Sequence, residues 1–128
     1  MNNSVIMSKS DMMEKAFAFY RRVLMSDHGL CAREYLLRKF GEIADFVGYA
    51  PQSWDAFYIH LDASEILLAS ECGLIVPYKV RVGYYDRLRD RLVYPMMGDG
   101  GVGIVELYGK LPPWGNPEFP HRVVVSIL

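Results

Sequence analysis

The hydrophobic pattern at the start of the chain has the period of an α-helix. Apolar residues recur at the spacing of one helical face: Met13, Ala16, Phe17, Tyr20, Val23 and Leu24. Ser8 followed by Asp11, or Ser10 at its own turn, offers an N-cap just ahead of this run. The pattern predicts a helix over about 11–25, preceded by a loose polar tail over residues 1–9.

A second helical stripe follows a turn at residues 26–29. Its apolar positions are Leu36, Leu37, Phe40, Ile43, Ala44 and Val47. Gly48 stands where a C′ glycine would end a helix, and Pro51 opposes continuation. We therefore expect a helix reaching Val47 that forms an αα-hairpin with the first. A helix-turn-helix DNA reader is the alternative, but this second helix has no basic face.

After Pro51 the hydrophobic period changes to two. Phe57, Ile59 and Leu61 alternate with Tyr58 and His60, which predicts a half-buried strand over 56–61. An Asp–Glu capping box and a terminal glycine frame residues 62–73 and indicate a short helix over 63–72. The same residues also suit a strand over 65–70, so the sequence does not decide between the helix and the strand.

The rest of the chain reads mainly as strands. Alternation predicts strands over 74–76, 78–82, 102–108 and 122–127, with a proline-rich connector over 111–120. The spacing of Tyr85, Leu88 and Leu92 predicts one more short helix, closed by Pro95. The fold class predicted for residues 10–128 is a single α+β domain. In it an N-terminal helical hairpin packs on a mainly antiparallel sheet of four or five strands, with one or two short inserted helices.

The stretch around residue 100 contains a literal G-x-G-x-x-G, formed by Gly98, Gly100 and Gly103. In a dinucleotide-binding fold this motif follows a strand and opens a helix. Here Pro95 lies before it, and the strand-forming residues 104–108 follow it. We therefore interpret the stretch as a glycine-rich hairpin turn and predict no cofactor.

Composition and charge argue against nucleic acid as a partner. The 128 residues are 52% hydrophobic and 23% charged, with a formal net charge of −1 and therefore no basic excess. The densest positive patch is the run Arg81, Arg87, Arg89 and Arg91. Because Asp86 and Asp90 dilute it, we favour the solvated face of the short helix over an anion-binding site, which is the alternative.

Cysteine and histidine placement gives no sign of a disulfide or metal site. Cys31 and Cys72 are too few and too far apart for a disulfide framework or zinc, and we interpret them as two reduced, buried thiols. His28, His60 and His121 share no metal-ligand spacing. The N-terminus lacks a signal-peptide pattern and no apolar run is long enough for a membrane span. We expect a cytoplasmic protein without a membrane partner.

The predicted cleft lies between the helices and one sheet face. The polar-tipped residues expected at its edge are Tyr58, His60, Tyr78, Glu106 and Tyr108. Glu106 is the carboxylate most suited to acid–base chemistry, because a strand position between apolar residues would raise its pKa. Trp114 and Phe119, on the stiff connector, are the candidates for an interface, and the alternative is that they pack back against the edge of the sheet.

Two functional hypotheses follow. The first is a non-enzymatic binding or regulatory protein that binds a protein partner or a small apolar molecule, with a homodimer as one form. The alternative is a small cone-shaped α+β enzyme that performs proton transfer or hydrolysis with Glu106 and His60. The first is favoured, because no stretch of the chain carries a specific catalytic motif.

Overall fold

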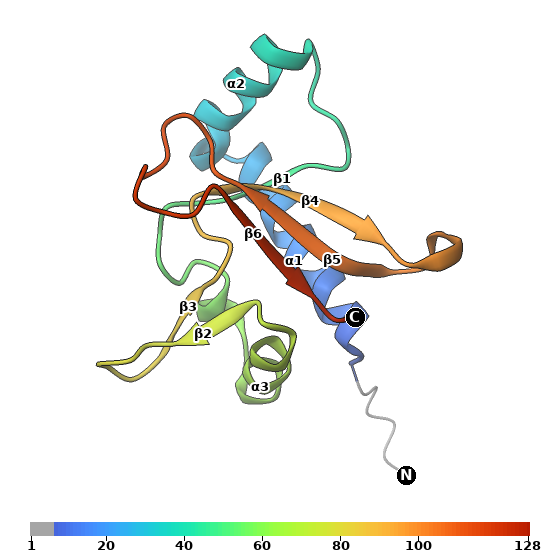
Figure 1. Ribbon diagram of the computed structural model, residues 1–128, viewed down its shortest axis with the longest axis vertical. Coiled ribbons are helices and arrows are strands. Elements are labelled where there is room, and N and C mark those ends of the chain that lie inside the picture. Colours follow the sequence, from blue (N-terminus) through green and yellow to red (C-terminus); the bar gives the residue numbers. More distant parts are fainter. Residues whose placement is uncertain (1–6) are drawn as a thin grey trace.

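The computed structural model describes residues 7–128, with helices first and mainly strands afterwards (Figure 1). The helices are α1 (Lys9–Met25), α2 (Leu30–Phe40) and α3 (Ala63–Cys72). The strands are β1 (Gly48–Ala50), β2 (Ile75–Pro77), β3 (Tyr84–Asp86), β4 (Arg91–Met97), β5 (Ile104–Lys110) and β6 (Arg122–Ser126). Short 3₁₀ turns lie at Asp27–Gly29, Tyr58–His60 and Asp99–Gly101.

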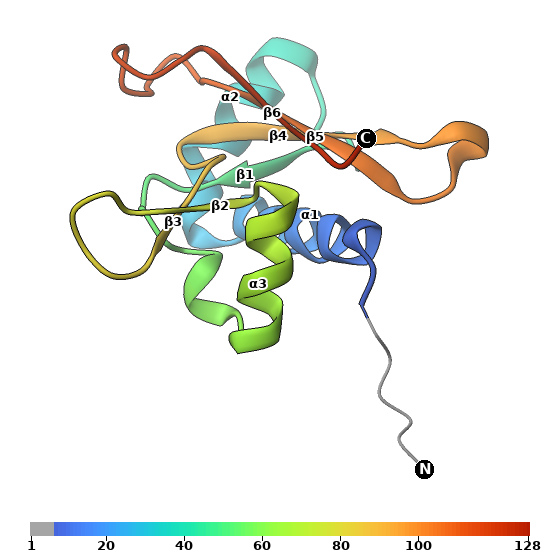
Figure 2. The same cartoon turned by 60° about the horizontal axis from the view of Figure 1, so that its bottom comes forward.

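Within the described residues, β1, β4, β5 and β6 form one antiparallel sheet in the order β1-β4-β5-β6, and β2 pairs with β3. Figure 2 shows this sheet nearly edge-on, with α1 and α3 on one side of it. The second helix, α2, packs beside the β1 end through a smaller apolar cluster. The predicted fold class, α+β with a helical hairpin on a mainly antiparallel sheet, is confirmed.

Helix α1 has the predicted cap and the predicted buried face. The Ser8 hydroxyl accepts from the Asp11 N–H at 3.0 Å, and the Asp11 carboxylate accepts from the Ser8 N–H at 3.0 Å. Met13, Ala16 and Tyr20 are fully buried. The helix begins slightly earlier than predicted, so the end of the predicted tail belongs to it, while residues 1–6 lie outside the described residues.

Helix α2 ends at Phe40, and the prediction that it reaches Val47 is wrong. Gly41 adopts a left-handed φ of 78°, and its N–H donates to the Leu37 carbonyl at 2.9 Å. The carbonyls of Ala44 and Val47 instead accept hydrogen bonds from the Arg21 guanidinium of α1, at 2.7 and 3.1 Å. A side chain from another helix therefore holds the segment that the local spacing assigned to α2.

The predicted role of Gly48 as a helix cap is also wrong, because this residue begins β1. A Cβ at Gly48 would lie 2.9 Å from the Tyr20 carbonyl carbon. The absence of a side chain lets β1 approach α1 closely.

Residues 63–72 form helix α3, which decides between the two structures that the sequence left open. The Asp62 carboxylate accepts from the Glu65 N–H at 2.9 Å, and the Glu65 carboxylate accepts from the Asp62 N–H at 3.0 Å. Gly73 ends the helix with a left-handed φ of 82°. The predicted capping box is confirmed.

The predicted strand over 56–61 is absent, and a 3₁₀ turn at Tyr58–His60 takes its place. The N–H groups of Phe57 and Tyr58 donate to the side chain of Asp86, so they are not available to a neighbouring strand. Of the residues expected to face inward, Phe57 is buried but Ile59 is exposed.

The predicted strand over 78–82 and the predicted helix over 85–92 are also wrong. Residues 78–83 form the connection between β2 and β3, and residues 87–90 form a turn between β3 and β4. The N–H groups of Asp86 and Arg87 donate to the distant carbonyls of Trp54 and Leu74. Pro95 does not close a helix but lies within β4, opposite Leu107.

The G-x-G-x-x-G stretch forms the β4–β5 hairpin turn, as predicted. The Gly98 N–H donates to the Gly103 carbonyl at 2.9 Å, and strand β5 follows the last glycine. A Cβ on Gly103 would overlap the Ser10 hydroxyl of α1, so this glycine lets the turn approach α1.

A β-bulge changes which side chains of β5 face the core. Met96 pairs with Glu106 but Met97 pairs with Ile104, which leaves Val105 as the extra residue. Ile104 and Leu107 therefore both lie in the core, although they are not an even number of positions apart. Regular strand alternation would place Glu106 on the same face as Ile104, two residues before it, but the bulge places Glu106 on the opposite face.

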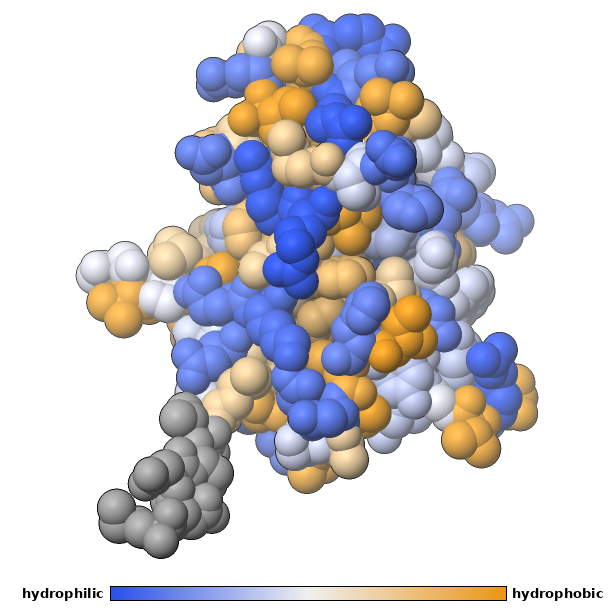
Figure 3. Space-filling view, turned by 180° about the vertical axis from the view of Figure 1, so that it is seen from behind, coloured by the Kyte–Doolittle hydropathy of each residue, from blue (hydrophilic) through white to orange (hydrophobic). Residues whose placement is uncertain are grey.

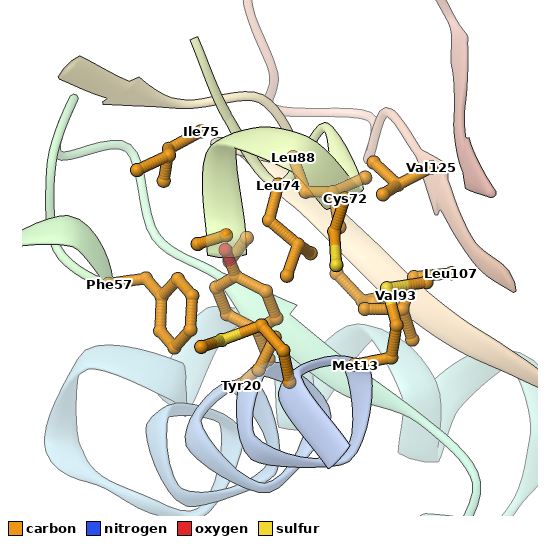
Figure 4. Packing of buried hydrophobic residues seen from close by; sticks show 14 of the residues in the cluster. Met13, Tyr20, Phe57, Cys72, Leu74, Ile75, Leu88, Val93, Leu107 and Val125 are labelled. Carbon is orange, nitrogen blue, oxygen red and sulfur yellow. The ribbon is translucent and has the colours of Figure 1, made fainter. Parts of the chain in front are cut away.

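The main core lies between α1, α3 and the inner face of the sheet (Figure 4). Figure 4 shows Met13 and Tyr20 of α1 pointing toward side chains from the other elements, including Phe57, Leu74 and Leu107. Tyr20 is fully buried, and burial raises the pKa of its hydroxyl. Side chains thus fill the space where a cleft between helices and sheet was predicted.

Of the two thiols, Cys72 is buried as predicted, but Cys31 is exposed on α2, so that half of the prediction is wrong. Within residues 7–128, no helix combines the length and the apolar character needed to span a membrane.

Candidate functional site

Three segments that are far apart in the sequence meet at the turn between β3 and β4. We call residues 86–91 the arginine turn; it contains Asp86, Arg87, Leu88, Arg89, Asp90 and Arg91. Residues 51–58 lie against it from one direction and residues 114–120 of the proline-rich connector from another. Its backbone and side chains bind both segments, so the turn is a structural junction and not a solvated helix face.

Asp86 is hydrogen-bonded to the segment that contains Trp54. Its N–H donates to the Trp54 carbonyl at 2.6 Å, and its carboxylate accepts from the N–H groups of Phe57 (2.7 Å) and Tyr58 (3.1 Å). Burial raises the pKa of Asp86 to about 6, against the opposing effect of these two hydrogen bonds. The position of Trp54 is therefore tied to the arginine turn.

Asp90 and Arg91 make further hydrogen bonds between the turn and the two neighbouring segments. The Asp90 N–H donates to the Pro51 carbonyl at 2.9 Å, and its carboxylate accepts from the Asn116 N–H at 3.2 Å. Asp90 has a φ of 60°, a conformation that aspartate tolerates better than most residues. Arg91 is 2% exposed and donates to the Pro120 carbonyl at 2.8 Å. Arg91 thus holds the connector in place and is not available to a ligand.

Arg89 lies among three aromatic rings: Trp54, Tyr85 of β3 and Phe119 of the connector. Its guanidinium carbon is 3.9 Å from the ring centroid of Trp54, and 4.7 Å from those of Tyr85 and Phe119. Each such cation–π contact is worth roughly 0.5–2 kcal/mol, more when the cation is desolvated. Trp54 nevertheless remains 49% exposed, so the stack presents an aromatic surface to solvent beside a fixed cation.

Tyr78 and Arg81 extend this surface toward the β2–β3 connection. The Tyr78 ring lies 6.1 Å from Trp54 and 5.5 Å from Tyr85, centroid to centroid. The Arg81 guanidinium carbon lies 4.3 Å from the Tyr78 ring centroid. We define the aromatic–arginine cluster as Trp54, Tyr78, Arg81, Tyr85, Arg89 and Phe119.

Positive charge gathers at the cluster and is partly offset by Asp86 and Asp90, which both interact electrostatically with Arg89. Among residues 7–128, the ion pairs are Lys15–Glu65 and Arg21–Asp45, neither of which involves the cluster. Arg81 and Arg87 are exposed, and Lys79 beside them is exposed as well. Burial lowers the pKa of Arg89, but a guanidinium remains charged at neutral pH. These cations carry positive charge next to stacked rings, an arrangement that suits a phosphate beside a base.

The structure separates the residues predicted to edge a cleft. Tyr78 belongs to the cluster, and Tyr58 lies near it, with its ring 5.4 Å from Tyr84. His60 is exposed and packs on Phe19 of α1, at 5.4 Å between ring centroids. Glu106 and Tyr108 lie on the outer sheet face, opposite Met96 and Tyr94 respectively.

The alternative catalytic pair, Glu106 and His60, is not brought together. Glu106 alternates in β5 with Leu107, whose side chain points to α1, whereas His60 lies on the α1 side of the molecule. Figure 3 shows this side, where hydrophilic side chains form a band down the middle of the surface. The two groups lie on opposite sides of the sheet and cannot share a substrate atom.

The two connector aromatics face different partners. Trp114 donates from Nε1 to the Tyr49 hydroxyl at 3.4 Å and lies edge-on to Tyr35 of α2. Phe119 packs against Arg89. Both are half-buried within this chain, and their role as an interface stays a prediction.

Sequence reasoning missed Trp54, Tyr85 and the stacking of Arg89. The available signal was the alternation of aspartate and arginine through residues 86–91, which also fits an exposed helix. The partners that decide its environment, Trp54 and Phe119, are distant in sequence, so local spacing could not reveal them.

No family model matches the chain. The DNA primase of Synechococcus elongatus is 35% identical over 94 residues, which cover 67% of this chain and 14% of that protein. The DNA primase of Halalkalibacterium halodurans is 34% identical over 113 residues, covering 83% of this chain and 19% of that protein. The chain thus spans less than a fifth of the length of these relatives.

Solved primase structures share the fold. The Escherichia coli primase catalytic core superposes with a TM-score of 0.77 at 22% identity, over 91% of this chain and 38% of that chain. The RNA polymerase domain of Mycobacterium tuberculosis primase DnaG, in complex with a double-stranded DNA oligomer with a 6-nucleotide overhang, gives 0.72 at 26% identity, over 92% and 38%. A DnaG primase catalytic domain bound to ssDNA gives 0.73 at 19% identity, over 92% and 37%.

These similarities correct the functional predictions. A non-enzymatic binding or regulatory protein is wrong as the favoured function, because the relatives and structural neighbours are DNA primases, which are enzymes. The exclusion of nucleic acid is also wrong, since neighbouring structures contain ssDNA and double-stranded DNA. A protein partner, a small apolar ligand and a homodimer have no support from them. In sequence the chain is similar to part of DNA primases, and in fold it is similar to part of a primase catalytic core.

Proposed function

We propose that this chain is a nucleic-acid-binding part of a primase-type, RNA-synthesising enzyme, and that the aromatic–arginine cluster contacts the bound strand. The observation that carries the proposal is the stack of Arg89 on half-exposed Trp54, with the exposed cation Arg81 stacked on neighbouring Tyr78. The similarity to primases crystallised with DNA supports the same partner. A cytoplasmic location, predicted from the sequence, stays part of this proposal.

The chemistry of the cluster favours a single strand. Aromatic faces stack on bases of any sequence, and alanine substitution of such a ring costs roughly 1–3 kcal/mol per base. Trp54 and Tyr78 supply the rings, Arg81 is stacked on Tyr78, and Arg87 is an exposed cation of the adjoining arginine turn. A net charge of −1 does not oppose this, because the local cluster and not the whole chain meets the strand.

The test is the affinity of the chain for a fluorescein-labelled single-stranded DNA, measured by fluorescence anisotropy over a salt series. We expect Trp54→Ala to weaken binding roughly tenfold, which corresponds to the loss of one stacked base. Arg87→Gln and Arg81→Gln should each lower the slope of log K against log salt by about 0.7, as expected for one phosphate contact.

Arg38→Gln is the matched control, because Arg38 is exposed in the last turn of α2, outside the cluster. Arg87 and Arg81 are exposed, so their variants report on binding even if Trp54→Ala is destabilised. The proposal is overturned if the wild type does not bind at low salt, or if all four variants bind alike.

A further inference from the structure

The connection between β2 and β3 presents two valines almost wholly to solvent. The loop is closed by a hydrogen bond from the Tyr78 N–H to the Gly83 carbonyl at 3.1 Å. Between these residues, Val80 is 94% exposed and Val82 is 97% exposed. Figures 1 and 2 both show the loop projecting away from the body of the molecule.

Two cations alternate with these valines. Lys79 and Arg81 are both exposed. Cationic and apolar side chains therefore alternate along residues 79–82, which form the tip of the loop. Single exposed apolar residues are common and need no explanation. A pair at the end of a projecting loop, each beside a cation, is a surface suited to an anionic partner with apolar interior surfaces.

The tip is continuous with the aromatic–arginine cluster. Arg81 is stacked on Tyr78 at 4.3 Å, and Tyr78 lies 6.1 Å from Trp54, centroid to centroid. A strand that stacks on Trp54 and Tyr78 would therefore reach the base of this loop. The β4–β5 turn also projects and carries an exposed valine, Val102 at 78%, but glycines flank that valine and no cation does.

We propose that residues 79–82 form a wedge that inserts Val80 and Val82 between bases where a single strand meets a duplex, while Lys79 and Arg81 bind the flanking phosphates. Apolar side chains inserted at a base step unstack it, and added contacts offset the free-energy cost of the unstacking. This inference rests on the proposed function, because the cluster supplies the adjoining single-strand contact.

A lipid membrane is another class of partner that combines anionic groups with an apolar interior. Two valines bury little area, whereas stable membrane attachment needs a larger apolar face or a second anchor. The neighbouring rings of Trp54 and Tyr78 favour nucleic acid, because they offer stacking surface for bases.

The experiment uses a forked duplex with 2-aminopurine at the junction, whose fluorescence rises when the base is unstacked. Wild-type protein should bind and raise the fluorescence. The double variant Val80→Ser/Val82→Ser should lose the rise while its anisotropy-derived affinity stays within about twofold, as expected for surface substitutions. Val102→Ser, on the opposite turn, is the matched control and should retain the rise. Lys79→Gln/Arg81→Gln should weaken binding to the fork.

The outcomes separate the inference from the proposed function. Binding without a fluorescence rise, or an equal rise in the double valine variant, overturns the wedge and leaves the proposed function standing. No binding to fork or single strand overturns both. Binding to anionic phospholipid vesicles that the double valine variant loses, without a junction signal, shows that the tip contacts lipid and overturns the wedge.

Discussion

The carboxylate of Asp86 accepts the N–H of Phe57 at 2.7 Å while only 1% of the residue is exposed. The same residue donates its own N–H to the carbonyl of Trp54. The buried carboxylate thus fixes the turn that begins at Tyr58, and the backbone N–H of the same residue fixes the segment that carries the ring on which Arg89 stacks. Because this carboxylate is desolvated, it affects how the stability of the fold depends on pH.

The free energy of unfolding should depend on pH through Asp86. Burial raises its pKa from 3.8 to about 6, so the folded state binds a proton more readily than the unfolded state. The contribution of Asp86 to the free energy of unfolding is therefore fully present below the pKa of the unfolded state. It falls by up to about 3 kcal/mol as the pH rises through 6. Urea unfolding of wild type and Asp86→Asn between pH 4 and 7.5 measures it.

The difference between the two proteins isolates Asp86 from other carboxylates. The pKa values of Asp11 and Asp62 are lowered by hydrogen bonds in their capping boxes, and these groups act in the opposite direction in both proteins. Asp99→Asn, at an exposed position in the β4–β5 turn, is the control. Parallel curves for wild type and Asp86→Asn would contradict the prediction.

Gly103→Ala should destabilise the fold more than Gly100→Ala. Both glycines have a left-handed φ, 68° and 74°, which costs alanine roughly 1–2 kcal/mol. A Cβ on Gly103 would also overlap the Ser10 hydroxyl, whereas one on Gly100 meets nothing within 4 Å. Thermal denaturation of both variants checks this order.

A double-mutant cycle tests the cause of that difference. Ser10→Ala removes the overlapping oxygen, so Gly103→Ala should cost less in the Ser10→Ala background than in the wild type. Equal costs in the two backgrounds would show that contact with Ser10 is not responsible.

The two thiols should differ strongly in reactivity. Cys31 is exposed, while Cys72 is buried and burial raises the pKa of its thiol. Ellman's reagent should therefore modify one thiol quickly in the native protein and the second only after denaturation. Cys31→Ser should remove the fast phase, and a fast phase that survives this change would contradict the assignment.

Leu107→Ala should destabilise the protein by about 2–5 kcal/mol, the range for a large-to-small change in a packed core. Leu107 has no exposed surface and lies in the main core. Val102→Ala, at a position 78% exposed, should change stability by less than about 0.5 kcal/mol. Similar losses in the two variants would contradict the assignment of the inner face of β5.

Local signals explain which elements could be predicted. Helices α1 and α3 each begin with a capping box, and the glycine turn is followed by strand formers, so neighbours in sequence decide these structures. The end of α2 could not be predicted, because the apolar spacing continues past Gly41. What holds that segment is Arg21, a residue of α1.

The candidate site was hidden for a similar reason. The arginines of residues 86–91 are visible in the sequence, but their spacing fits a solvated helix as well as a turn. Arg91 is buried by the connector and Arg89 by rings from three segments. Apart from Tyr85, the groups that surround these two arginines are distant in sequence, so local spacing could not predict either environment.

The sequence by itself determined the fold class, the capped helices and the hairpin turn, because hydrogen bonds and side chains within a few residues stabilise them. Only the tertiary structure decided which charges lose water and which aromatic rings stay exposed. Desolvation and stacking depend on whichever groups folding brings within a few ångströms. For Arg89 those groups come from three separate stretches of the chain.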